Sequence, residues 1–209
     1  MAGDITVATA RSDAAVVRGT DELTERILDA SLGLVARWGV TKTALADVAK
    51  AAGCSRATVY RAFPGGKTHL FHSLAVRELA SYLDAVLDAI DAGEDLADAV
   101  TRGLVVATRL LHDHDAAQFV LGHEPGLLLP FLGFKQVDVL YAHTDAVVGP
   151  HFERFLPAER AAWLAEWCAR LFLTYLFNPD PEFDLAVVDH ARDLVTRFVL
   201  PSFPPPSDS

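Results

Sequence analysis

The residues best suited to chemistry lie between Thr43 and Phe63, where basic, hydroxyl and aromatic side chains recur at short intervals. Between Arg37 and Lys67 the chain carries six basic residues and the single acid Asp47, although the net charge of the whole chain is −10. Positive charge that is concentrated on one short segment can neutralise the phosphates of a nucleic acid. We therefore expect this segment, and not the acidic remainder, to bind a polyanion.

The same segment meets the geometric demands of a helix-turn-helix. Ala49 is small enough for a second helix to cross close above it, and Gly53, four residues later, can take the left-handed conformation that a tight turn needs. Val48 and Val59 can then close a small shared core. The spacing therefore predicts two short helices that meet at a tight turn.

In this geometry the first residues of the second helix face base edges in the major groove of DNA. Arg56, Ala57 and Thr58 occupy those positions. Lys50 and Arg61 supply positive charge for the phosphates on either side. We interpret the segment as a DNA-binding motif.

The elements that must position this motif are predicted to be helical throughout, because apolar residues recur at helical spacing and no stretch alternates as a strand does. Thr43 and Ser55 are the expected N-caps of the two short helices. We predict an all-α fold of roughly nine helices, with the others over 21–38, 67–92, 96–111, 116–123 (a short one), 128–148, 158–177 and 185–200.

Four parts follow from these breaks and from changes in composition. They are a flexible arm over 1–20, a three-helix helix-turn-helix domain over 21–66, a helical effector-binding and dimerisation domain over 67–200 and a Pro-rich tail over 201–209. The long helix from Lys67 joins the two domains. We expect a cytoplasmic protein, since the first residues lack the pattern of a signal peptide and no apolar run approaches the roughly 20 residues of a membrane span.

On these residues the sequence resembles the TetR family of bacterial regulators, from about Leu23 to Leu74. The positions that carry the resemblance are Ile27, Ala30, Leu34, Gly39, Thr43, Ala49, Gly53, Ser55, Thr58, Tyr60, Phe63, Lys67 and Leu70. The chain departs from the family pattern in one place, because three residues, and not the usual two, separate Phe63 from Lys67.

The resemblance implies that Thr43, Tyr60 and Lys67 contact phosphates, while Arg56, Ala57 and Thr58 face bases. Structural alternatives exist for single residues, since Tyr60 could be a core aromatic and Arg56 an exposed solubilising charge. The predicted DNA-binding residues are Thr43, Lys50, Ser55, Arg56, Ala57, Thr58, Tyr60, Arg61 and Lys67.

The helix expected over 158–177 is apolar around more than half of its circumference, so it should bury one side in its own domain and another against a partner. In the family that the chain resembles, the last two long helices pair with their copies as a four-helix dimer bundle. A deep monomeric core is the alternative. The expected interface residues are Leu164, Leu171, Phe172, Tyr175, Val195 and Phe198.

A second apolar cluster with a few polar groups is typical of a small-molecule sensor. Its expected pocket residues are Phe119, His123, Glu124, Leu128, Phe131, Phe134, Trp163 and Trp167. The stretch from His123 to Pro130 is similar to actinobacterial TetR-like regulators of fatty-acid or alkane metabolism, which implies a small, apolar, fatty-acid-like effector. The alternative is that these residues only pack a core, with His123 at a helix end.

The run from His112 to Asp115 alternates His and Asp, two residue types that ligate metals. Residues at i and i+2 do not share a helix face, so we interpret the run as a solvated helix end and expect no metal site. Because the chain also lacks a GxSxG motif, a Gly-rich phosphate loop and a CxxC motif, we expect neither an enzyme nor a cofactor.

Together these features predict a transcriptional repressor that binds a palindromic DNA operator as a homodimer and is released by the effector. A two-fold dimer would present its two recognition helices about 34 Å apart, one DNA turn. Two alternatives remain: a metal-dependent α-helical hydrolase built on 112–115, and a helix-turn-helix regulator that is controlled by a protein partner.

Overall fold

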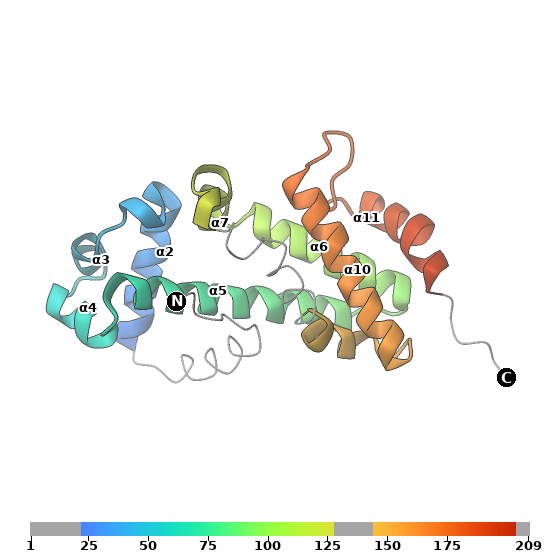
Figure 1. Cartoon of the computed structure of the whole chain (residues 1–209), viewed down its shortest axis with the longest axis horizontal. Coiled ribbons are helices and arrows are strands. Elements are labelled where there is room, and N and C mark those ends of the chain that lie inside the picture. The colour runs from blue at the N-terminus through green and yellow to red at the C-terminus, as the bar shows by residue number, and fades with distance from the viewer. Residues whose placement is uncertain (1–21, 128–143, 204–209) are drawn as a thin grey trace. The chain divides into compact units, whose positions relative to one another are not determined.

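The computed structural model describes residues 22–127 and 144–203, which form helices joined by turns (Figure 1). Within these ranges no β-strand occurs, and the extended pairing is limited to one isolated bridge between Asp180 and Phe183. The prediction of an all-α fold is confirmed. The chain divides into two compact units, of which unit 1 contains the described residues 22–81 and 112–127 and unit 2 contains 82–111 and 144–203.

Unit 1 is built around the N-terminal helices. Its elements are α2 (Glu22–Lys42), α3 (Leu45–Ala51), α4 (Arg56–Ala62), the first part of α5 (Gly66–Asp91), α7 (Asp115–His123) and the 3₁₀ turn η1 (Pro125–Leu127). The side chains of Ile27, Leu28, Val48, Val59 and Leu70 are completely buried in its core. Burial of each such side chain stabilises the folded unit by about 1.5–3 kcal/mol.

The first helix is interrupted at Gly39, where the sequence predicted its end, and continues to Lys42. Gly39 interrupts α2 with φ 79° and ψ 171°, a backbone region that is essentially confined to glycine. Residues 40–42 return to helical geometry after this break. The break turns the chain toward α3.

One of the two predicted caps is confirmed and the other is wrong. The side chain of Ser55 accepts a hydrogen bond from the backbone N–H of Thr58 and caps α4. The N-cap of α3 is Ala44, which makes no side-chain cap bond. Thr43 is instead completely buried, and its hydroxyl donates to the carbonyl oxygen of Gly39 at 2.6 Å, because the break in α2 leaves that carbonyl available.

Unit 2 is helical as well. Its elements are the second part of α5, α6 (Leu96–His112), a helix over 144–152, α10 (Ala158–Phe177), α11 (Val188–Leu194), the π-helical turn η2 (Val195–Val199) and the 3₁₀ turn η3 (Leu200–Ser202). α5 and α6 approach closely at Gly103, where a Cβ atom would lie 2.7 Å from Cγ1 of Ile90. Phe152, Leu164 and Leu185 are among its most deeply buried side chains.

Several predicted boundaries differ from the structure. The last helix begins at Val188 and not at Leu185, because the carboxylate and carbonyl of Asp184 accept hydrogen bonds from Ala186 and Val187 and form a turn there. The helix predicted to end before 149–150 continues to residue 152. The predicted arm over 1–20 and most of the helix over 128–148 lie outside the described residues. Among the described helices, none is long and apolar enough to cross a membrane.

Candidate nucleic-acid interface

The turn between α3 and α4 has the geometry that the sequence predicted. Gly53 takes a positive φ of 65°, and the backbone N–H of Cys54 donates to the carbonyl of Ala49 at 2.9 Å, which closes the turn. Val48 and Val59 belong to one buried cluster. The two helices are therefore held at a fixed angle by a small shared core, and Figure 1 shows them as short blue and cyan helices after α2.

The outer face of α4 is polar and exposed at its beginning. Ser55, Arg56 and Ala57 are exposed, and the hydroxyl groups of Ser55 and Thr58 lie 2.8 Å apart in a hydrogen bond. Nη2 of Arg61 donates to Oγ1 of Thr58 at 3.4 Å. Neither Arg56 nor Arg61 pairs with a carboxylate in the part of the chain that the structure describes.

Arg56 and Tyr60 form a pair one helical turn apart. Nη2 of Arg56 donates to the Tyr60 hydroxyl at 3.3 Å, and the guanidinium carbon lies 5.4 Å from the centroid of the Tyr60 ring. Tyr60 is 42% exposed. The structure thus places Tyr60 at the surface beside Arg56, and not as a core aromatic.

Two of the predicted phosphate contacts have partners inside unit 1. The hydroxyl of Thr43 is buried against Gly39, as described above, so this side chain is not presented at the surface. Nζ of Lys67 donates to the carbonyl oxygen of Thr41 at 2.8 Å and lies 5.7 Å from the ring centroid of Phe71. Lys50, in contrast, is exposed in the last turn of α3.

Glu124 has a role that the sequence analysis missed. Its two carboxylate oxygens accept hydrogen bonds from the backbone N–H groups of Val40 and Thr41, at 2.7 and 2.9 Å. Desolvation alone would raise the pKa of Glu124, but these hydrogen bonds and the charge of Lys67 outweigh it and hold the pKa below its ordinary value. The Glu124 carboxylate therefore accepts hydrogen bonds from two backbone N–H groups that follow the helix break, as a capping residue does. It lies more than 80 residues away from both of them in sequence.

The break at Gly39 and the Glu124 contact depend on each other. A Cβ atom at residue 39 would lie 2.6 Å from Cε1 of Phe119 and 2.7 Å from Cδ of Glu124. α7 can therefore pack against α2 only because residue 39 has no side chain. The ring of His123 stacks on Phe119 at 4.5 Å between centroids, on the same helix.

The residues predicted to line an effector pocket are divided by the structure. Phe119, His123 and Glu124 belong to unit 1, whereas Trp163 and Trp167 belong to unit 2. The remaining three, Leu128, Phe131 and Phe134, lie outside the described residues.

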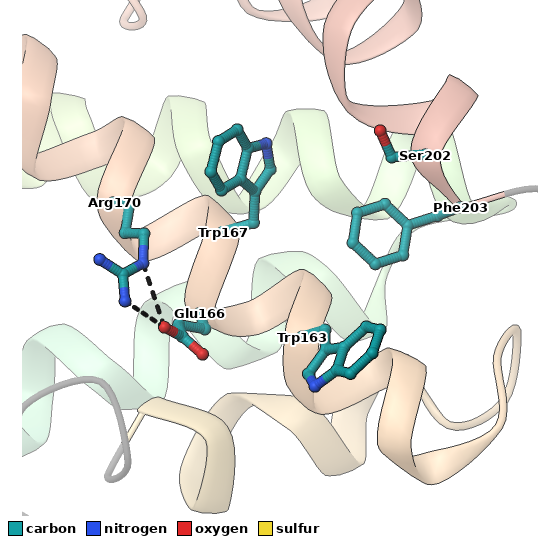
Figure 2. Close-up of a pocket in the computed structure, with 6 residues that line it drawn as sticks. All are labelled: Trp163, Glu166, Trp167, Arg170, Ser202 and Phe203. Atoms are coloured by element: carbon teal, nitrogen blue, oxygen red, sulfur yellow. Dashed lines mark hydrogen bonds and ion pairs between the residues drawn. The ribbon is translucent and has the colours of Figure 1, made fainter. Parts of the chain in front are cut away.

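An open groove of about 410 Å³ lies along α10 in unit 2. It is lined by Trp163, Glu166, Trp167, Arg170, Ser202 and Phe203. Figure 2 shows both indole rings and the Phe203 ring around the groove, with an ion pair between Glu166 and Arg170. Trp163 and Trp167 are 60% and 45% exposed, so these large apolar groups face solvent in the isolated chain.

The predicted dimer residues fall into two groups. Leu164 and Val195 are completely buried inside unit 2, and Leu171, Phe172 and Tyr175 are partly buried. Phe198 is 69% exposed. The wide apolar arc of α10 therefore reflects one side packed in its own unit and a second side that is exposed.

A partly buried acid in unit 2 also escaped the sequence analysis. Oδ1 of Asp145 is buried and has no hydrogen-bond partner among the described residues. Desolvation, and after it the charge of Glu166, raises the pKa of Asp145. No spacing signal marks this residue, because its environment comes from a distant helix.

The run over 112–115 ends one helix and begins the next. Nδ1 of His114 accepts a hydrogen bond from the N–H of Ala117 and caps α7, while Nε2 lies 3.2 Å from Oε2 of Glu78. Within the described ranges, no three His, Cys, Asp or Glu side chains gather as a metal site.

Comparison with known proteins agrees with this geometry. Residues 27–74 match the family described as bacterial regulatory proteins, tetR family. An uncharacterized HTH-type transcriptional regulator of Mycobacterium bovis is 32% identical over 99 residues, which are 47% of this chain and 50% of that protein. A second such regulator, from Mycobacterium tuberculosis, is 31% identical over the same length. The chain thus matches about half the length of these curated relatives.

Two solved structures share the fold. The TetR family repressor AlkX from Dietzia sp., implicated in biodegradation of n-alkanes, has a TM-score of 0.57 and 18% identity over 82% of this chain and 92% of its own. The fatty acid degradation regulator FadR from Bacillus halodurans has a TM-score of 0.61 and 18% identity over 84% and 95%.

The turn geometry and the exposed basic face of α4 are those of a helix-turn-helix, a motif that DNA-binding proteins use. More narrowly, residues 27–74 match the tetR family of bacterial regulatory proteins, and the fold of the chain is similar to the folds of AlkX and FadR.

Proposed function

We propose that the chain is a cytoplasmic transcriptional repressor that binds a palindromic DNA operator as a homodimer and leaves it when a small apolar effector binds. The observation that carries this proposal is the beginning of α4, where Arg56 is exposed, unpaired with any described carboxylate and fixed on a rigid two-helix scaffold. Such a helix start reads base edges in the major groove.

The exposed side of unit 2 supports the homodimer. Large apolar side chains with high exposure gather on α10 and the turn after α11: Trp163, Trp167, Phe177 and Phe198. Aromatic groups of this size contribute most of the binding energy when an interface covers them. A second copy of the chain would cover them and would place two recognition helices on one face of DNA.

The nature of the effector rests on the fold neighbours. AlkX is implicated in the biodegradation of n-alkanes, and FadR is a regulator of fatty acid degradation. Both n-alkanes and fatty acids contain an apolar hydrocarbon chain. We propose an effector of the same chemical class, with a switch that is transmitted along α5. An effector that drives a near-complete release must bind the DNA-incompetent state more tightly by about 5.5 kcal/mol.

Selection from random double-stranded DNA tests the proposal. The full chain should enrich one palindrome, and its affinity for that sequence should fall by about a thousandfold between roughly 50 and 200 mM salt as counterions are released. Failure to enrich a palindrome, or binding that is independent of salt, would exclude the proposed DNA-binding function.

A second titration tests the effector. Long-chain fatty acids added to the preformed DNA complex should release the DNA at concentrations that leave free protein folded. Release by a protein from the same cell, with no effect of any apolar molecule, would favour the alternative of a protein-controlled regulator.

A further inference from the structure

The contact between Arg56 and Tyr60 fixes the guanidinium group before DNA binds. Nη2 of Arg56 donates to the Tyr60 hydroxyl at 3.3 Å while the guanidinium carbon lies 5.4 Å from the ring centroid. An exposed arginine otherwise samples many rotamers, and each must be given up when it binds. A tyrosine with two simultaneous contacts reduces that cost.

The ring of Tyr60 lies beside the start of α5. A Cβ atom at Gly66 would lie 3.5 Å from Cε1 of Tyr60, so the ring edge lies near this residue, with room for a methyl group between them. Gly66 has a positive φ of 64°, and its N–H donates to the carbonyl of Phe63 at 2.8 Å. The residues before Lys67 therefore form a hydrogen-bonded turn beside the Tyr60 ring.

The remaining hydrogen-bonding groups of the pair are available to DNA. Arginine has five N–H donors in a planar fork, and only one is used on Tyr60, so the others can pair with O6 and N7 of guanine. The Tyr60 oxygen accepts from Arg56, which leaves the hydroxyl proton free to donate to a phosphate oxygen. One tyrosine can thus connect a backbone phosphate to a base-reading arginine.

We propose that Tyr60 is a positioning residue that holds Arg56 for a guanine in each half of the operator, and so contributes to sequence specificity as well as to affinity. The inference rests on the proposed DNA-binding function. In this proposal Tyr60 contacts a phosphate and also couples that contact to the base contact of Arg56, because hydrogen bonds in a chain strengthen one another.

The test is a double-substitution cycle on the palindrome that the wild-type chain selects. Four proteins are compared: wild type, Tyr60→Phe, Arg56→Ala and the double variant. Each is titrated with the selected DNA and with copies in which single G·C pairs are replaced. Tyr60→Phe keeps the ring and removes only an exposed hydroxyl, and unchanged thermal unfolding confirms that the fold is kept.

We expect Arg56→Ala to abolish the preference for guanine at one position of each half-site. Tyr60→Phe should lower that same preference by about tenfold, a coupling of about 1.4 kcal/mol, and should not change it further when Arg56 is already alanine. Lys50→Ala is the matched control, because it should weaken every sequence equally and leave the base preference intact.

The inference is overturned if Tyr60→Phe weakens all sequences equally and its effect simply adds to that of Arg56→Ala, as a phosphate contact alone would do. If the wild-type chain selects no sequence, the proposed function fails and the inference fails with it. A selected palindrome whose guanine preference survives in Tyr60→Phe overturns only the inference.

Discussion

Two exposed helix faces, one in each unit, differ in what they present to solvent. The beginning of α4 exposes a guanidinium group, hydroxyl groups and a small alanine, whereas α10 exposes two indole rings, Trp163 and Trp167. Charged and hydroxyl groups match the phosphates and base edges of DNA, while apolar aromatic groups match another apolar surface. We therefore expect the two faces to bind different partners, so a change on one should leave the function of the other intact.

The largest expected effect concerns the aromatic face. Replacing both Trp163 and Trp167 by alanine should raise the dimer dissociation constant by about a thousandfold, because the homodimer loses four tryptophans at about 1 kcal/mol each. Sedimentation velocity measures the change. Trp38→Ala is a matched control, since Trp38 on α2 has the same 45% exposure as Trp167. A double variant that stays dimeric, or a Trp38 variant that becomes monomeric, would refute this assignment.

A smaller effect should follow from filling the break in α2. Gly39→Ala forces a positive φ and places a methyl group within 2.6–2.8 Å of Phe119 and Glu124, so unit 1 should lose about 3 kcal/mol of stability. Gly33→Ala, on the same helix with no atom within 4 Å of its Cβ position, should instead raise stability by up to about 1 kcal/mol.

Urea unfolding with a probe in each unit measures both glycine variants. We also expect Gly39→Ala to weaken DNA binding and to leave the dimer dissociation constant unchanged, because Gly39 lies in unit 1 and the aromatic face of α10 lies in unit 2. Equal stability of the two variants would contradict the role given to Gly39.

The smallest effect concerns Glu124. Glu124→Gln weakens the hydrogen bonds to Val40 and Thr41 and should cost about 1 kcal/mol at neutral pH. Because the pKa of Glu124 is lowered by folding, its contribution is complete above the ordinary value of 4.5 and is lost as the pH falls through the folded-state value. The stability difference between wild type and variant should therefore shrink on acidification below about pH 4.5, and a difference that grows there would exclude the assignment.

The sequence predicted most where the determinants are local. The turn at Gly53 and the Ser55 cap each depend on residues within a few positions, so residue type and spacing were sufficient. The roles of Glu124 and Thr43 were missed because their partners come from a helix break and, for Glu124, from a contact across more than 80 residues.

In unit 2 the apolar pattern of α10 predicted two buried sides but did not separate them. Leu164 packs in the core and Trp163, its neighbour in sequence, is 60% exposed. The apolar periodicity predicts which sides of a helix are apolar, but it does not predict what packs against each side. The packing depends on how the helices are arranged in space. The predicted pocket residues were divided between the two units for the same reason.

The most direct test of the account compares the base preferences of Arg56→Ala and Lys50→Ala on the selected DNA. Both residues are exposed and basic, but only Arg56 lies at the beginning of α4. The account predicts that Arg56→Ala loses discrimination of about 1–3 kcal/mol at one base pair of each half-site, whereas Lys50→Ala weakens all sequences alike and reduces the salt dependence. Unchanged base preference in Arg56→Ala would contradict the claim that α4 reads DNA.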